Sequence, residues 1–426
     1  MEKKSLDTLC VHGGYVPLDG ESRVAPIFQS TAFSFNNADH VAALFDLEKE
    51  GHMYSRISNP TVEILEKKIA SLEGGVGALC TSSGQAATLL AVLTICSEGD
   101  HIVAFNNIYG GTFTLFSSTL KGLGIDTTFV DLNAQDEDIS KLIHPNTKLL
   151  FGETIANPLG QVLDIRRFAN LAHKHGIPLV VDNTFPTPVL SRPFEFGADI
   201  VTHSTTKYLD GHATSVGGAI VDSGSFDWEN GKFPGLTEKD PSYHGLSYTE
   251  KFGKKAFIQR ARVVFLRDLG TSMSPFNAFL TNLGIETLAL RMEKHSTNAL
   301  TVAKYLESNP YVEWVNYPLL ESSPDYSLAQ EYLADGASGV VTFAIKGGIE
   351  QGKQFIDNLE LVSLAVHVGD VRSLVLHPAS TTHRQLSAED KKIAGIADNM
   401  IRLSVGIEDV QEIIRDIENA LRKSQR

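Results

Sequence analysis

Short runs of apolar residues alternate along the chain with stretches in which apolar residues recur every three or four positions. The short runs predict buried strands, and the recurring pattern predicts amphipathic helices such as Asp164–His175. Alternation of this kind is typical of a mostly parallel sheet with helices on both faces. The strands predicted in the first part of the chain are Val76–Cys80, Ile102–Phe105, Thr127–Val130, Leu149–Gly152, Pro178–Val181, Asp199–Val201 and Val216–Val221.

Two neighbouring strands in this pattern end in polar residues instead of a Gly/Pro turn. Pro178–Val181 is followed by Asp182, and Asp199–Val201 leads into a hydroxyl-rich turn that ends at Lys207. Ligand groups sit at the carboxyl ends of strands in open parallel sheets, so both endings are expected at one crevice. The lysine could bond to the aldehyde of a cofactor, and the carboxylate could pair with a protonated ring nitrogen. Taken singly, a surface lysine and a helix-capping aspartate remain the alternative interpretation.

A second candidate site follows the strand Val76–Cys80. The chain there passes through Thr81-Ser82-Ser83-Gly84-Gln85 into a predicted helix, Ala86–Val92. A strand, a turn of small residues and a helix N-terminus together can bind an anion, because the first N–H groups of the helix point outward. A βα turn without any ligand is the alternative.

The ends of the chain differ from this central region. Residues 1–60 lack a sustained period and predict an irregular arm that must dock on something, with a neighbouring subunit as the candidate. Residues 61–268 then form the first predicted domain, and 269–426 form a smaller C-terminal α/β domain.

A long stretch, Phe226–Phe257, predicts a loop that is functional or forms an interface. The expected elements of the C-terminal domain are a linking helix Ile285–Leu306, strands Val312–Val315, Gly339–Ile345, Leu361–Val366, Ser373–Leu376 and Ile401–Val405, and helices near Gln351–Leu359 and Val410–Leu421.

Composition excludes several classes of function. The net charge of −14 over 426 residues argues against nucleic acid or an anionic membrane as the main partner. The three cysteines form no CxxC pair, and the N-terminus lacks an apolar signal segment, so a cytoplasmic protein with reduced thiols is expected. No Walker A, HExxH or GxGxxG motif is present, so neither a metal site nor a nicotinamide dehydrogenase is predicted.

With these residues assembled, the chain resembles the Cys/Met-metabolism family of pyridoxal-phosphate (PLP) enzymes, which have the aspartate-aminotransferase-type fold (fold type I). The resemblance covers nearly the whole chain and makes the first domain the PLP-binding one. It rests on Tyr54-Ser55-Arg56, Asn59-Pro60-Thr61, Ser83-Gly84-Gln85-Ala86-Ala87, Tyr109-Gly110-Gly111-Thr112, Asp182-Asn183-Thr184, Ser204-Thr205-Thr206-Lys207-Tyr208, His377-Pro378-Ala379-Ser380 and Arg402-Leu403-Ser404-Val405-Gly406.

The resemblance implies a role for each cofactor-binding residue. Lys207 would be the lysine that bonds PLP and then carries protons, together with Tyr109, which would also stack on the cofactor ring. Asp182 would keep the ring nitrogen protonated. The phosphate would be held by the backbone N–H groups of Gly84 and Gln85 and the hydroxyls of Ser204 and Thr206.

The resemblance also implies how substrate binds and how chains assemble. Arg402 would grip the substrate carboxylate, with Asn157 and the Ser373 backbone nearby. Tyr54 and Arg56 would reach the phosphate from a neighbouring subunit, and Tyr54 would also face the substrate. A homodimer is therefore the minimal active unit, and a homotetramer is expected.

Departures from the family's branches narrow the expected reaction. Methionine γ-lyases typically carry Cys where this chain has Gly111, and cystathionine synthases and lyases carry Arg where it has Thr114. The insertion Phe226–Phe257 looks like that of the O-acetylhomoserine sulfhydrylase branch. The expectation is γ-replacement on O-acetyl-L-homoserine by sulfide or methanethiol, giving homocysteine or methionine and acetate. Cystathionine γ-synthase, cystathionine γ-lyase or methionine γ-lyase activity is the alternative, as is a binding protein without cofactor. Arg260 or Arg262 could supply the positive charge that is missing at Thr114.

Overall fold

A seven-stranded sheet forms the centre of the larger unit in the computed structural model, which describes residues 4–333, 336–381 and 397–425. The strand order is β1-β7-β6-β5-β4-β2-β3; β7 runs antiparallel to both of its neighbours, and the other pairs are parallel. All seven strands predicted for this region are confirmed, with ends that differ by at most two residues. They are β1 (Gly77–Thr81), β2 (His101–Phe105), β3 (Asp126–Val130), β4 (Thr147–Glu153), β5 (Leu179–Asp182), β6 (Ile200–His203) and β7 (Gly218–Asp222).

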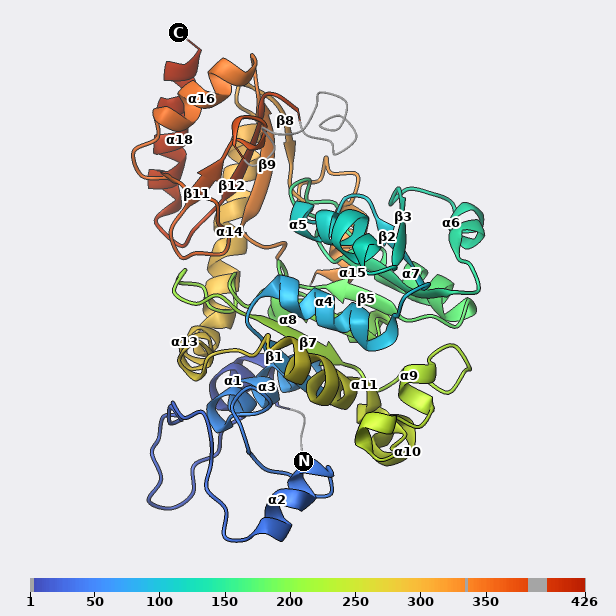
Figure 1. Cartoon of the computed structure of the whole chain (residues 1–426). Coiled ribbons are helices and arrows are strands. Elements are labelled where there is room, and N and C mark those ends of the chain that lie inside the picture. The colour runs from blue at the N-terminus through green and yellow to red at the C-terminus, as the bar shows by residue number, and fades with distance from the viewer. Residues whose placement is uncertain (1–3, 334–335, 382–396, 426) are drawn as a thin grey trace.

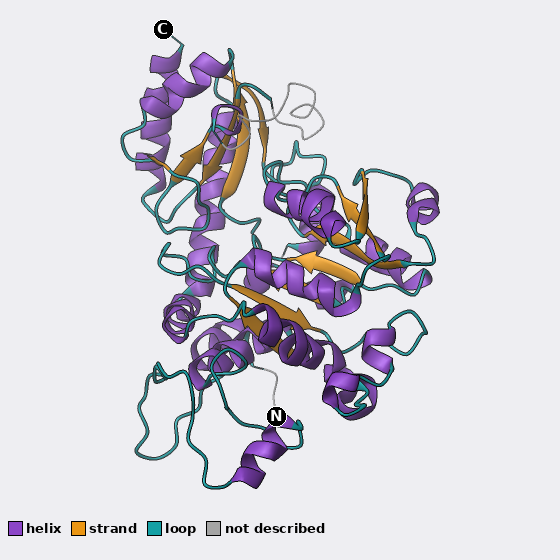
Figure 2. Cartoon of the chain, viewed as in Figure 1, coloured by secondary structure: helices purple, strands orange, loops and turns teal. Residues whose placement is uncertain are grey.

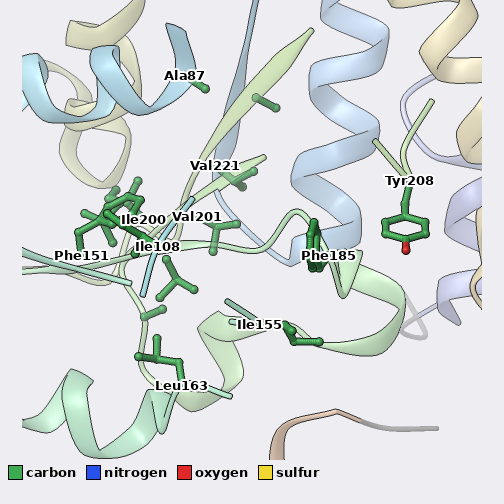
Figure 3. Close-up of a cluster of buried hydrophobic side chains, with 14 of the residues drawn as sticks. Ala87, Ile108, Phe151, Ile155, Leu163, Phe185, Ile200, Val201, Tyr208 and Val221 are labelled. Atoms are coloured by element: carbon green, nitrogen blue, oxygen red, sulfur yellow. The ribbon is translucent and has the colours of Figure 1, made fainter. Parts of the chain in front are cut away.

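Helices cover both faces of this sheet. Every residue of β2 and of β7 is buried, and because successive side chains of a strand point to opposite faces, both faces are covered. Helix α4 (Gly84–Ile95) packs on β6 and β7, and α7 (Ile165–Lys174) packs on β4 and β5 (Figures 1 and 2). Figure 3 shows part of the resulting core, including Phe151 of β4 and Ile200 and Val201 of β6.

The C-terminal unit is a second, smaller sheet in the described part of the chain. Its order is β10-β11-β12-β9-β8, and only β10 and β11 pair in parallel. Helix α14 (Leu288–Glu307) runs from the larger unit along this sheet, and α18 (Val410–Ser424) lies beside α16 (Ile349–Asp357) at the outer side (Figure 1). The strands are β8 (Val312–Asn316), β9 (Val340–Ile345), β10 (Ser363–Leu364), β11 (Leu374–Leu376) and β12 (Met400–Ser404).

Two C-terminal elements differ from the sequence prediction. The predicted strand Leu361–Val366 is reduced to β10, because the chain leaves the sheet after Leu364 and turns towards the larger unit. The predicted linking helix Ile285–Leu306 is confirmed as α14, but its first two residues belong to the end of a separate helix, α13 (Pro275–Glu286), which meets α14 at Thr287.

The N-terminal arm contains regular structure that the sequence analysis did not predict. Helix α1 (Leu6–His12) is capped by Ser5, and α2 (Ala38–Phe45) is capped by Asn37, so the prediction of an irregular arm was wrong for these two segments. Between them the arm is irregular and extends beyond the sheet at the foot of Figure 1. Several of its apolar side chains are exposed, namely Val11, Val16, Leu18, Val24, Ile27, Phe28 and Phe45.

The long stretch Phe226–Phe257 folds as a small helical insertion. Trp228 stacks on Phe257 with ring centroids 5.4 Å apart, and Phe226 and Phe233 pack against Trp228. The insertion contains α9 (Pro234–Thr237), η3 (Pro241–Tyr243), α10 (Tyr248–Phe252) and η4 (Gly253–Lys255).

The remaining helices connect the strands of the larger unit or lie beside the C-terminal sheet. Among the described residues, no helix combines the length and the apolar character needed to cross a membrane. These helices are α3 (Pro60–Glu73), α5 (Gly110–Thr114), η1 (Leu115–Leu120), α6 (Asp136–Leu142), α8 (Thr187–Leu190), η2 (Pro193–Phe196), α11 (Ala256–Arg260), η5 (Ala261–Leu266), α12 (Arg267–Leu269), α15 (Tyr326–Tyr332) and η6 (Pro378–Ser380).

Candidate active site

A cavity of about 280 Å³ lies where the carboxyl ends of β4, β5 and β6 meet a loop of the C-terminal unit. This is the edge of a parallel sheet at which ligands usually bind. Most of the residues predicted for the site line it. The lining residues are Ser83, Gly84, Gln85, Tyr109, Thr112, Glu153, Ile155, Asn157, Asp182, Thr184, Phe185, Ser204, Thr206, Lys207, Val216, Val366, His367, Val368 and Arg402.

One end of the cavity has the chemistry of a phosphate site. Ser83 caps α4, and the first N–H groups of a helix have no partner within it, so Gly84 and Gln85 can donate to an anion. A Cβ on Gly84 would lie 2.7 Å from the Cβ of Ser204, so only glycine allows this close approach. The Thr206 hydroxyl, which also lines the cavity, donates to the Gly217 carbonyl at 3.1 Å.

Asp182 is the last residue of β5, and it lines the cavity. Its carboxylate accepts a hydrogen bond of 2.9 Å from the backbone N–H of Thr184. Burial raises the pKa of Asp182, while the bonds from Thr184 and the nearby His203 lower it. A cationic ring nitrogen at this carboxylate would offset the cost of burying its charge.

Glu153 is a buried residue of this site that the sequence analysis did not assign to it. One carboxylate oxygen accepts from the Tyr109 N–H at 2.7 Å, and the other accepts from the Asn157 N–H at 3.2 Å. A single side chain therefore positions two predicted site residues from different loops. Burial and the adjacent Asp182, opposite it on β5, raise the pKa of Glu153 well above its usual range. Its place at the end of a predicted strand was the signal available in the sequence.

Lys207 follows β6 and projects into the cavity as an amine that loses its proton easily. Burial, with the positive charge of Arg402, lowers the pKa of Lys207 to about 8. Its Nζ lies 3.3 Å from Nδ1 of His367, which the sequence analysis also did not predict. Lys207, Asp182 and the phosphate end thus fit an aldehyde, a ring nitrogen and a phosphate, the three groups of PLP.

Arg402 and Asn157 come together on the C-terminal side of the cavity. Nη1 of Arg402 donates to Oδ1 of Asn157 at 3.2 Å, and Nη2 donates to the His367 carbonyl at 3.4 Å. Burial lowers the pKa of Arg402 to about 10, and its buried Nε has no partner among the described residues. A guanidinium with an unpaired N–H in a cavity is suited to binding a carboxylate.

Ser373 is not brought to the cavity. Its N–H donates to the Glu408 carboxylate at 2.6 Å, and its carbonyl accepts from the Ser363 N–H at 3.1 Å. Its backbone N–H is therefore occupied, Ser373 does not line the cavity, and its predicted contact with substrate stays a prediction. The loop residue that does reach Arg402 is His367.

Tyr54 and Arg56 also lie outside the cavity of their own chain. Tyr54 is 45% exposed, and the Arg56 guanidinium lies 5.3 Å from its ring centroid and donates to the Arg267 carbonyl. Tyr109 at the cavity is 49% exposed, so one chain leaves that side of the site uncovered. The predicted role of Tyr54 and Arg56 in a neighbouring subunit stays a prediction.

The positions that distinguish the family's branches are also resolved. A Cβ on Gly111 would lie 2.5 Å from the Tyr109 ring, so a cysteine there would require this half-exposed ring to shift. Thr114 is exposed and does not line the cavity. Arg260 donates to the Thr94 carbonyl, and Arg262 pairs with Glu66 at 2.7 Å, so neither supplies a charge to the cavity.

Comparison with known proteins agrees with this geometry. The chain is 49% identical to the O-acetyl-L-homoserine sulfhydrylase of Leptospira meyeri, over 98% of this chain and 96% of the relative. It is 46% identical to O-acetyl-L-homoserine sulfhydrylase 1 of Thermus thermophilus, over 97% and 99% of the two chains. A crystal structure described as an O-acetylhomoserine (thiol)-lyase from Campylobacter jejuni, with N'-pyridoxyl-lysine-5'-monophosphate at its position 205, superposes with a TM-score of 0.95 at 40% identity, covering 98% of this chain and 100% of that one.

A family model matches residues 7–422, which is nearly the whole chain, and it describes Cys/Met metabolism PLP-dependent enzymes. The match spans both sheets and every lining residue of the cavity. The chain therefore belongs to the family of Cys/Met-metabolism PLP-dependent enzymes.

Proposed function

We propose that this protein uses PLP bound to Lys207 to replace the γ-acetoxy group of O-acetyl-L-homoserine with sulfide or methanethiol. The products would be homocysteine or methionine, with acetate. The choice of a small nucleophile rests on one observation. Arg402 is the only arginine among the described residues that line the cavity. One arginine can bind the carboxylate of one amino acid, and sulfide has no carboxylate to bind. The names of the full-length relatives support the same reaction.

The cofactor fits the cavity through the residues already described. The N–H groups of Gly84 and Gln85, with the Ser204 hydroxyl, would hold the phosphate, and the Thr206 hydroxyl would join them by turning its O–H away from the Gly217 carbonyl. Asp182 would pair with the ring nitrogen. Tyr109, whose backbone Glu153 fixes, would lie on the ring face. When bound, PLP supplies an electron sink that makes the substrate's Cα and Cβ protons acidic.

The protein's own groups would then bind substrate and move protons. Arg402, oriented by Asn157, would hold the substrate carboxylate and thereby place the Cα–H bond near Lys207. The fall of the Lys207 pKa from 10.5 to about 8 raises the fraction of free amine at neutral pH by about two to three powers of ten. Lys207 can thus take the Cα proton, and with Tyr109 it would move the Cβ proton as acetate leaves and sulfide adds at Cγ.

The choice of nucleophile is tested by assaying purified protein with O-acetyl-L-homoserine and either sulfide or cysteine, with products identified by mass. A charged hydrogen bond to a carboxylate is worth roughly 1.5–3 kcal/mol, or about one to two powers of ten in rate. Sulfide is therefore expected to react at least about tenfold faster than cysteine at matched concentration. Thr114 does not line the cavity, but Thr114→Arg puts a longer, cationic side chain at the position where the cystathionine branches have one. If that side chain reaches the cavity, the difference in rate between sulfide and cysteine should become smaller. Equal rates in the wild type would instead favour a cystathionine γ-synthase.

We infer that two chains complete each site, and we expect a homotetramer built from such dimers in the cytoplasm. The exposed apolar side chains of the arm, the half-exposed Tyr109, and the absence of Tyr54 and Arg56 from the lining of their own cavity support this assembly.

Complementation between inactive chains tests the shared site. Arg56→Ala and Lys207→Ala chains should each be inactive alone. If Arg56 acts in the partner's site, a hybrid dimer holds one site with both residues intact, so an equal mixture should recover about a quarter of wild-type activity. Activity is measured after unfolding and refolding the mixture, and hybrid formation is checked by mass. Hybrid dimers that form and stay inactive would contradict the proposal.

A further inference from the structure

A loop of the C-terminal unit, residues 365–373, is packed directly against the backbone that carries Lys207. Gly369 has φ +82°, and a Cβ on it would lie 2.7 Å from the Tyr208 nitrogen and 3.0 Å from the Lys207 carbonyl carbon. Its N–H donates to the Ser404 hydroxyl at 3.1 Å, and the Val371 N–H donates to Gly211 at 2.9 Å. These contacts fix the loop relative to Lys207. His367 and the buried Val368, which directly precede Gly369, line the cavity.

His367 contacts both functional cations of the cavity. Nδ1 of its ring lies 3.3 Å from Nζ of Lys207, and its carbonyl accepts from Nη2 of Arg402 at 3.4 Å. A lysine ammonium only donates, so Nδ1 is the acceptor and the ring proton is on Nε2. The buried Nε2 has no partner among the described residues, so no contact in the described chain opposes this tautomer.

We propose that His367 is a positioning residue for Lys207: its Nδ1 accepts a hydrogen bond from the Lys207 amine and holds that amine in place for cofactor capture and for proton transfer at Cα. The inference deepens the proposed function and rests on it, because it assigns a further residue to the same site. It concerns the state in which Nζ is not bonded to PLP.

The pKa values of His367 and Lys207 show which of the two side chains holds the proton. Burial, with the charges of Lys207 and Arg402, lowers the pKa of His367 to about 4, against the opposing effect of Asp370 and Asp210. The pKa of Lys207 is about 8. A difference of about four pKa units keeps the proton on Lys207 by a factor of about 10⁴. His367 is thus a neutral acceptor for the amine and does not take its proton.

Two substitutions of similar size test the role of Nδ1. His367→Asn keeps an acceptor oxygen close to the position of Nδ1, and His367→Leu removes it. A largely exposed histidine of the insertion, His244, provides the matched control His244→Leu. Folding of each variant is checked by circular dichroism and by thermal unfolding.

The first measurement needs no turnover. Apoprotein is mixed with PLP, and the rate at which borohydride-stable pyridoxyl-Lys207 forms is followed by mass. The second is the rate at which the Cα proton of L-homoserine exchanges into deuterium oxide, since this ligand lacks a good leaving group. We expect His367→Leu to slow both rates by about tenfold or more, the worth of one hydrogen bond to a charged group. His367→Asn should stay within a few-fold of the wild type, and the KM for O-acetyl-L-homoserine should change less than kcat.

The outcomes for this inference and for the proposed reaction are distinct. Wild-type rates of capture and exchange in His367→Leu, or equal losses in the Asn and Leu variants, would overturn the role of His367. A wild-type protein that captures PLP and exchanges the Cα proton but forms no product with sulfide would overturn the proposed function and leave His367 supported by its own measurements.

Discussion

Lys207→Ala should lower turnover by several orders of magnitude, roughly 10³ or more, because it removes both the attachment point of PLP and the group that carries the Cα proton. The prediction rests on the placement of Nζ in a cavity that also holds Asp182 and the N-terminus of α4. The test is borohydride reduction followed by peptide mapping, together with kcat. Wild-type protein should carry pyridoxyl on Lys207, and Lys207→Ala should carry none.

A surface lysine of the insertion, Lys251, supplies the control. Lys251→Ala should keep the label and the activity, since its Nζ lies at the surface and donates to the Asp46 carbonyl. A label found on another lysine in the wild type would show that the assignment of Lys207 is wrong.

The pH dependence of this attachment has a definite direction. Burial disfavours the ammonium form, and the charge of Arg402 disfavours it further, so the pKa of Lys207 falls to about 8. Capture of PLP by the apoprotein needs the free amine. Its rate should therefore rise with pH and level off above about 8. Arg402→Met removes one of the two causes, and it should move the midpoint of the profile to higher pH.

Much of the fold was predictable because its signals are local. Most strands of the large sheet contain a short apolar run, and Asp182 and Lys207 follow closely after the apolar runs of β5 and β6 in the sequence. Asp182 and Lys207 could thus be assigned to one crevice without knowledge of any long-range contact. The helices of the arm also had a local signal, the capping residues Ser5 and Asn37, but each helix is too short to show a clear period.

The rest of the site depends on contacts between residues that are far apart in the chain. Glu153 acts through the Tyr109 N–H, 44 residues away, and His367 reaches Lys207 across 160 residues. No periodicity encodes such pairs. The bond from Arg402 to the His367 carbonyl is another such contact, between residues 35 positions apart.

Asp182→Asn should lower kcat by about two to three powers of ten while leaving the apoprotein intact. The side chains have the same shape, and an asparagine oxygen can still accept from the Thr184 N–H that now bonds Asp182 at 2.9 Å. What is lost is the charge that would keep the ring nitrogen of PLP protonated. Breaking a buried pair of charges by removing one partner costs roughly 3–5 kcal/mol, and part of that loss should appear in the transition state.

Thermal unfolding separates this effect from simple destabilisation. Burial raises the pKa of Asp182 in the folded chain above its unfolded value, so when no cation faces it this carboxyl lowers stability as pH rises between those two pKa values. Apoprotein of the Asp182→Asn variant should therefore unfold at the same temperature as the wild type or higher. Added PLP should raise the Tm of the variant less than that of the wild type, because the favourable pairing is gone. Asp182→Glu, which keeps the charge, is the control. A wild-type kcat and a wild-type Tm shift on adding PLP to Asp182→Asn would show that Asp182 does not face the ring nitrogen.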